Sequence, residues 1–101
     1  MILYNVTIRV DEDIAEEWLN WMKTKHIPDV MRTGCFTDYK IMRILQPVQD
    51  EDSITYAVQY FCEDQQKLES YWQNDAPALQ KEHLEKYSDK ALAFRTVMEL
   101  V

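Results

Sequence analysis

His26 is one of two histidines in this chain of 101 residues, and it directly precedes the segment Ile27-Pro28-Asp29. Proline interrupts the hydrogen bonds of a helix, so this segment predicts a junction between two helical pieces. A histidine beside a carboxylate at such a junction can accept a proton near neutral pH, which makes His26 a candidate catalytic base. Alternatively, its ring hydrogen-bonds a carbonyl group that the proline leaves free, a structural role that the electrostatics of a helix C-terminus also favour.

Aromatic residues at helical spacing suggest the wall of an apolar pocket between helices and a sheet: Trp18, Trp21, Tyr71 and Trp72. The same spacing is typical of residues that simply fill a core, because large aromatic side chains bury large areas. Tyr39 and Arg43 share one phase on a predicted strand and are expected at the mouth of such a pocket. A ligand site would therefore use Trp21, Tyr39 and Arg43 for binding, beside His26.

Composition excludes several classes of activity. The net charge is −7, from 11 basic and 18 acidic residues, whereas nucleic acid needs a concentrated basic face. The single glycine, Gly34, excludes the glycine-rich loops that hold phosphates. The two histidines and the scattered acids have no metal-ligand spacing, and no motif signals a Ser-His-Asp set. We therefore expect neither nucleic acid nor a metal ion as a partner.

The two cysteines are Cys35 and Cys62. Residues 1–5 have no signal-peptide pattern and no apolar run reaches membrane-spanning length, so we expect free thiols in the cytoplasm and no membrane partner. If the strands on either side of residues 46–53 pair, the two thiols fall near each other and a redox pair is conceivable. A shift of one residue in that pairing places them on opposite faces.

The chain consists of two similar halves. Ile2-Leu3-Tyr4-Asn5-Val6 returns as Ile54-Thr55-Tyr56-Ala57-Val58. In both copies the apolar residues alternate along the segment, which predicts a strand, and an acidic turn and a long helical stretch follow. A repeat of this kind is typical of a split βαβ fold.

Apolar spacing and helix breakers place the expected elements. The first helix runs to about His26, a short helix follows from Pro28 to Arg32, and Gly34 closes it in a left-handed conformation. Glu63 and Asp64 start the second helix, which is interrupted by Asp75-Ala76-Pro77. Further strands are expected at 36–45, 54–62 and 92–100, with a polar loop at 46–53. The order predicts one domain over residues 1–101, an α+β ferredoxin-like βαββαβ two-layer sandwich with an antiparallel sheet.

The sheet face turned away from the helices has a mixture of polar and apolar residues. The strand phases assign it eight residues: Asn5, Thr7, Arg9, Ala57, Gln59, Phe61, Arg95 and Val97. This mixture is too apolar to stay bare and too polar for the core of a monomer. We therefore expect a homodimer that forms through this face.

Several stretches together resemble a known superfamily, the dimeric α/β barrels, in which two ferredoxin-like sheets pack through that second face. They are Tyr4-Asn5-Val6-Thr7, Glu17-Trp18-Leu19-x-Trp21-Met22, His26-Ile27-Pro28-Asp29-Val30, Thr33-Gly34-x-Phe36, Tyr56-x-Val58-Gln59-Tyr60, Asp75-Ala76-Pro77 and Ala93-Phe94-Arg95-Thr96. More closely, they are similar to an uncharacterised family of short bacterial proteins, a domain of unknown function. The superfamily includes monooxygenases, haem-degrading enzymes, lactone isomerases and sugar mutarotases, so the fold does not indicate the reaction.

Two hypotheses follow from the resemblance. In the first, a homodimer binds a small, partly apolar molecule between helices and sheet, with cofactor-independent monooxygenase or isomerase chemistry that uses His26. In the second, the protein is a non-catalytic homodimeric structural or interaction domain. Haem-degrading members suggest Asn5, Trp72 and His83 as a haem site, but the phase of the first strand points Asn5 away from the helices. We therefore expect no cofactor.

Overall fold

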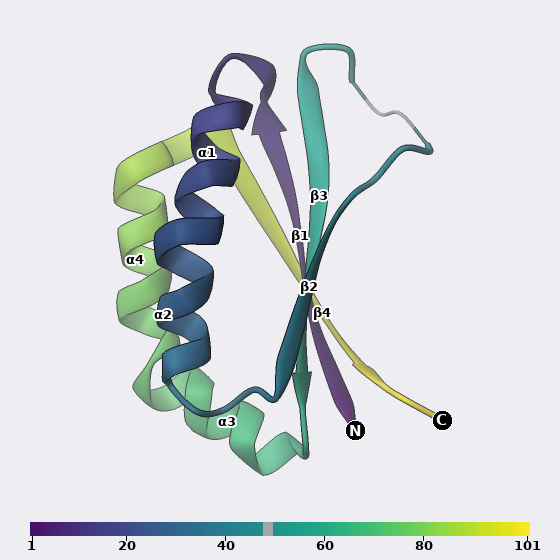
Figure 1. The fold of residues 1–101 in the computed structure, drawn as a ribbon, viewed down its shortest axis with the longest axis vertical. Helices are drawn as coiled ribbons and strands as arrows, with labels where there is room; N and C mark the ends of the chain where they lie inside the picture. Colours follow the sequence, from purple (N-terminus) through teal and green to yellow (C-terminus); the bar gives the residue numbers. More distant parts are fainter. Residues whose placement is uncertain (48–49) are drawn as a thin grey trace.

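The computed structural model describes residues 1–47 and 50–101, in which four strands form one antiparallel sheet. They are β1 (Ile2–Asp11), β2 (Asp38–Arg43), β3 (Ser53–Cys62) and β4 (Ala91–Glu99), in the order β2-β3-β1-β4. The helices α1 (Ala15–Trp21), α2 (Ile27–Arg32), α3 (Gln65–Asn74) and α4 (Ala76–Tyr87) form a layer on one face of the sheet (Figure 1). The ferredoxin-like α+β sandwich predicted from the sequence is thus confirmed.

Short helical turns complete the connections. The 3₁₀ turns η1 (Glu12–Ile14) and η3 (Ser88–Lys90) follow β1 and α4, and the segment η2 (Met22–His26) joins α1 to α2. Of the predicted polar loop at residues 46–53, Val48 and Gln49 lie outside the described residues. The second strand is shorter than the predicted range 36–45, because Phe36 lies before it and packs in the core.

The core lies between the helix layer and the two central strands. Tyr4, Ile8 and Val10 of β1 are buried, as are Val58 and Tyr60 of β3. Alternate residues of a strand point to the same face, so these side chains form the stripe that the helices cover. The sequence repeat therefore supplies the two strands at the centre of the sheet, β1 and β3, which pair with each other.

The first helical arm differs from the prediction at Pro28. We expected a break there, but the backbone stays helical from α1 through α2, and η2 is a π-helical turn in which Ile27 donates to the carbonyl of Met22. The turn adds one residue, so the buried side chains Met22 and Ile27 are five positions apart instead of four. Both keep their place over the sheet although the proline follows. The later break, at Asp75-Ala76-Pro77, is confirmed, because α3 ends and α4 begins there.

The phase of β4 was predicted wrongly. Arg95 lies opposite Val6 and Val97 lies opposite Tyr4 in the ladder with β1, so both face the helix layer and not the uncovered face. The uncovered face instead receives Leu92, Phe94, Thr96 and Met98. β4 is an edge strand whose residues after Ala93 are exposed on both faces, so its apolar residues do not mark an inner side.

Candidate functional site

A cavity of about 40 Å³ lies between the helix layer and strands β1, β3 and β4. Twelve residues line it: Tyr4, Val6, Ile8, Met22, His26, Val58, Tyr60, Tyr71, Gln80, His83, Ala93 and Arg95. This volume holds about three water-sized groups. The side chains come from both helical arms and from three strands, so the whole fold is needed to build the site.

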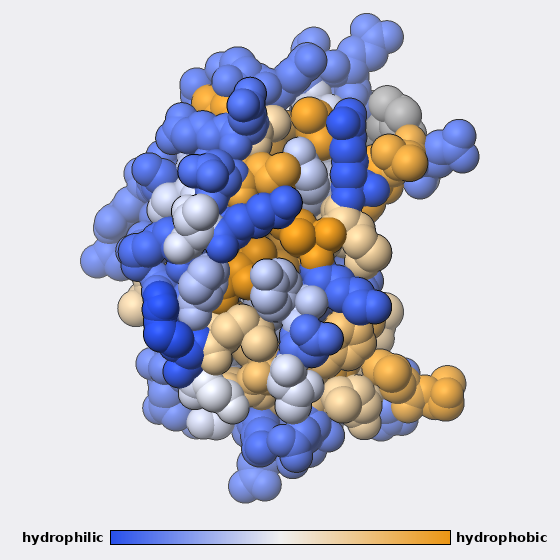
Figure 2. All heavy atoms as spheres, in the orientation of Figure 1, coloured by the Kyte–Doolittle hydropathy of each residue, from blue (hydrophilic) through white to orange (hydrophobic). Residues whose placement is uncertain are grey.

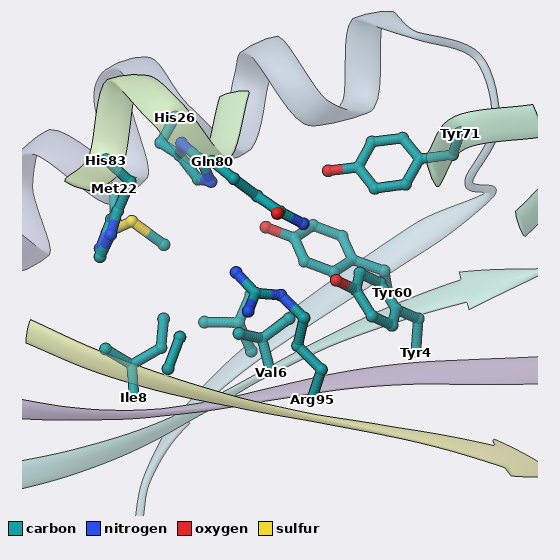
Figure 3. A pocket seen from close by; sticks show the side chains of 12 residues that line it. Tyr4, Val6, Ile8, Met22, His26, Tyr60, Tyr71, Gln80, His83 and Arg95 are labelled. Atoms are coloured by element: carbon teal, nitrogen blue, oxygen red, sulfur yellow. The ribbon is translucent and has the colours of Figure 1, made fainter. Parts of the chain in front are cut away.

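The lining has chemically distinct regions (Figure 3). His26, His83 and Met22 gather at one end, and the three tyrosines lie at the other. The side chains of Gln80 and Arg95 extend into the space between these ends, from the helix layer and from β4 respectively. Aliphatic side chains of the strands form the floor. Such a combination of an apolar floor with a few convergent polar groups is typical of a small-molecule site.

The π-helical turn places His26 at the cavity. Its ring lies 5.2 Å from the ring of Trp21 and 5.8 Å from that of His83, measured between centroids. The Nδ1 atom of His26 is buried and has no hydrogen-bond partner within residues 1–47 and 50–101. The structural role considered for His26, a bond to a free carbonyl group, is therefore not made through Nδ1.

Burial, together with the neighbouring His83, lowers the pKa of His26 to about 4. The imidazole is thus neutral at pH 7. The carboxylate predicted beside it, Asp29, is engaged elsewhere: it forms ion pairs with Lys25 and, at 2.8 Å, with Arg32. The hydrogen bond from Lys25 holds the pKa of Asp29 below its ordinary value, so this acid stays charged and does not orient the imidazole.

His83 faces the interior, although the residues around it are charged. Nε1 of Trp18 donates a hydrogen bond to Nε2 of His83 over 3.0 Å. Burial lowers the pKa of His83 too, with a further contribution from the charge of Arg95. Asn5 points to the uncovered face, where its amide donates to the hydroxyl of Thr7. The set of Asn5, Trp72 and His83 considered for haem therefore does not converge on one space.

Two of the tyrosines at the far end, Tyr60 and Tyr71, remain protonated. Burial raises the pKa of Tyr60 and of Tyr71 well above the ordinary value, and the neighbouring tyrosine Tyr4 adds to the effect. Their hydroxyl groups point toward the space that Gln80 and Arg95 enter (Figure 3). This end of the cavity therefore offers neutral hydroxyl donors beside a cationic guanidinium group.

The predicted ligand residues are only partly brought together. His26 lines the cavity and Trp21 packs against it from outside, whereas Tyr39 and Arg43 lie on the edge strand β2 and are not part of the lining. Arg43 instead borders two other depressions. Sequence reasoning did not assign Arg95 or Gln80 to the site. The sequence does contain a signal for His83: Leu79, His83 and Tyr87 are spaced by four, so His83 shares a helix face with two apolar residues.

Both cysteines are free thiols. Cys35 lies before the start of β2, so it does not take part in the pairing with β3, and its Sγ contacts Oδ2 of Asp75 at 3.9 Å. Cys62 is buried and its Sγ donates to the carbonyl oxygen of Asp64. Each thiol therefore has a polar partner of its own.

The fold is similar to that of solved proteins. An ethyl tert-butyl ether degradation (EthD) family protein of Bacillus halodurans matches over all of both chains, with 16% identity and a TM-score of 0.71. HapK of Hahella chejuensis matches over all of this chain and 93% of its own, with 11% identity and a TM-score of 0.73. A de novo designed protein with a ferredoxin fold matches over all of this chain and 88% of its own, with 17% identity and a TM-score of 0.51.

At these identities the likeness concerns the fold alone.

None of the helices within residues 1–47 and 50–101 has the length and apolar character that crossing a membrane would require. A comparison of the sequence with curated proteins finds no match. A family model matches residues 1–101 in full, and the chain belongs to that family, the domain of unknown function DUF4286.

Proposed function

We propose that this protein binds a small, partly apolar molecule in the cavity between helices and sheet, and that His26 exchanges a proton with it. The observation that carries the proposal is the buried Nδ1 of His26, which has no partner among the described residues and belongs to a cavity-lining side chain. A buried polar atom without a partner costs about 1–3 kcal/mol. A ligand in the cavity would offset that cost.

The proposed chemistry is cofactor-independent, as in a monooxygenase or an isomerase. A neutral imidazole with a pKa of about 4 is a weak base in the empty cavity. An anion that forms beside it during the reaction would raise the pKa of the imidazole and favour the proton transfer. Free thiols suit such a protein in a reducing cytoplasm.

The test compares the protein with the variant His26→Phe, which keeps an aromatic ring against Trp21 and removes both nitrogen atoms. We expect native mass spectrometry of protein purified without denaturation to show a retained small molecule, and we expect His26→Phe to lose it. The melting temperature should change little, because the ring has no bond through Nδ1 to lose. Loss of stability without loss of a ligand would support a structural role instead.

The second candidate function is a homodimeric structural or interaction domain. Large apolar side chains are exposed on the uncovered sheet face, among them Phe94 at 65%, Leu92 at 43% and Met42 at 41%. Hydrophilic side chains cover the outer side of the helix layer, and hydrophobic residues gather between that layer and the sheet, which is seen from its edge (Figure 2). An apolar sheet face of this kind marks an interaction site, and a second copy of the chain offers an equally apolar surface. The same mass spectra report the number of subunits.

A further inference from the structure

We propose that the ligand of this cavity is a small carboxylate, held by the guanidinium group of Arg95 with its apolar part against the sheet. This inference rests on the proposed binding of a small molecule and names its chemical class. Three observations support it: the charge of the lining, the position of Arg95 and the size of the space.

The charge of the lining is opposite to that of the whole chain. The protein carries a net charge of −7, yet the twelve lining residues include Arg95 and no aspartate or glutamate. Arg95 also contributes to the lowered pKa of His26 and of His83, so its positive charge acts on the histidine end of the cavity. An anion would therefore be attracted into the cavity, and a cation repelled.

Arg95 is free to bind a ligand. Its guanidinium group extends from β4 toward the space that Gln80 and the tyrosine hydroxyls also reach (Figure 3). None of the ion pairs found within the described part of the chain includes Arg95, whereas Arg9 and Arg32 each pair with an aspartate. An arginine presents a planar fork of N–H donors that matches a carboxylate through two parallel hydrogen bonds. The tyrosine hydroxyls can donate to the same oxygen atoms.

The size of the cavity sets the size of the ligand. A volume of about 40 Å³ holds a carboxylate group with a very short carbon chain. Val6, Ile8 and Ala93 provide the apolar floor for that chain. Arg95 is exposed on an edge strand, so a longer ligand could extend toward solvent beside it. A phosphate group carries a higher charge and would need a second cationic side chain. Among its twelve described residues, the lining has only Arg95.

The two histidines of the chain give a direct readout, because both line the cavity. The experiment follows the imidazole Cε1–H signals by NMR while sodium acetate is added at pH 7, with sodium chloride keeping the ionic strength constant. Acetamide serves as the uncharged probe of the same shape. We expect acetate to shift both signals to saturation and to raise the pKa of His26, and we expect acetamide to have a weaker effect.

Variants assign the effect to Arg95. Arg95→Gln should weaken acetate binding by about tenfold or more, and Arg95→Lys, which keeps the charge and loses the planar fork, should weaken it less. Lys81→Gln removes one positive charge from the exposed side of α4 and should leave binding unchanged; the side chain of Lys81 is 75% exposed. Backbone amide spectra confirm that each variant is folded.

The outcomes separate this inference from the proposed function. Equal binding of acetate and acetamide, or unchanged acetate binding in both Arg95 variants, would contradict the inference that the ligand is a carboxylate held by Arg95. The proposal of a small-molecule site would still stand. The absence of any saturable shift with acetate would also overturn the carboxylate inference. The proposed function would then be judged by the retained ligand and its loss in His26→Phe, which do not depend on the charge of the ligand.

Discussion

The indole N–H of Trp18 donates to Nε2 of His83 over 3.0 Å, which joins a residue of the first helical arm to one of the second. Trp18 is fully buried and its ring also stacks on Tyr56 at 5.1 Å. Because Nε2 accepts this bond, the proton of the neutral imidazole lies on Nδ1. The pair therefore fixes both the tautomer of His83 and the distance between the helical arms above the cavity.

Trp18→Phe should lower the free energy of unfolding by about 2–4 kcal/mol, because it leaves Nε2 of His83 without a donor and removes buried volume. Trp72→Phe is the matched control; Trp72 is 38% exposed and should cost less than about 1 kcal/mol. Urea denaturation measures both changes. Equal costs for the two variants would contradict the role assigned to this hydrogen bond.

Stability should depend on pH through His26. Its pKa is about 4 in the folded protein and about 6.5 in the unfolded chain, so the unfolded chain binds the proton more readily. The contribution of the neutral ring to stability is complete above pH 6.5, falls as the pH decreases from 6.5 to 4, and does not change further below pH 4. The loss over this range is at most about 3 kcal/mol.

His26→Gln removes this titration and leaves the other groups in place. The difference in free energy of unfolding between the protein and this variant should therefore shift against the protein as the pH falls from 6.5 to 4. Urea denaturation at a series of pH values measures it. A difference that stays constant over the range would mean that His26 is accessible to solvent and titrates normally.

The sequence predicts the centre of this fold better than its edges. Tyr4, Val58 and their neighbours alternate with a period of two because one face of each central strand is buried, and that pattern fixes both phase and topology. Strand β4 has no such constraint, so Arg95 was assigned to the wrong face and was not recognised as part of the site. A cavity depends on how side chains from distant elements meet, and periodicity carries no information on the space left between them.

The sequence contains a signal for the π-helical turn. The buried residues Met22 and Ile27 are five positions apart, a step that an ordinary α-helix does not make. Ile27→Ala should therefore cost about 2–4 kcal/mol, as for a core residue. In an α-helix without the π-helical turn, His26, four residues after Met22, would occupy the buried place that Ile27 has. A smaller cost for Ile27→Ala than for His26→Ala in thermal unfolding would contradict the observed register.

Substitutions at two positions with positive φ angles should change the stability in opposite directions. Ser88 has φ 53° and ψ −128°, a conformation that is strained for any residue except glycine, so Ser88→Gly should stabilise the protein by about 1 kcal/mol. Gly34, at φ 78°, ends the first helical arm as the sequence predicted, and Gly34→Ala should destabilise by a similar amount. Apart from its two chain neighbours, no described residue has an atom within 4 Å of the added Cβ, so the cost comes from the backbone alone. Melting temperatures that move in the same direction for both variants would contradict this explanation.

A charge on the uncovered sheet face should separate the proposed dimer. Phe94→Glu places a carboxylate on that face, on the edge strand β4, without disturbing the core, since the side chain is 65% exposed in the single chain. Burying an unpaired charge in an interface costs several kcal/mol, so we expect a folded monomer. Leu84→Glu is the control: Leu84 is 63% exposed but belongs to α4 in the helix layer, and this variant should remain a dimer. Native mass spectrometry counts the subunits of each. A dimeric Phe94→Glu variant would show that the copies associate through another surface, and a monomeric parent protein would mean that the apolar face serves a different partner.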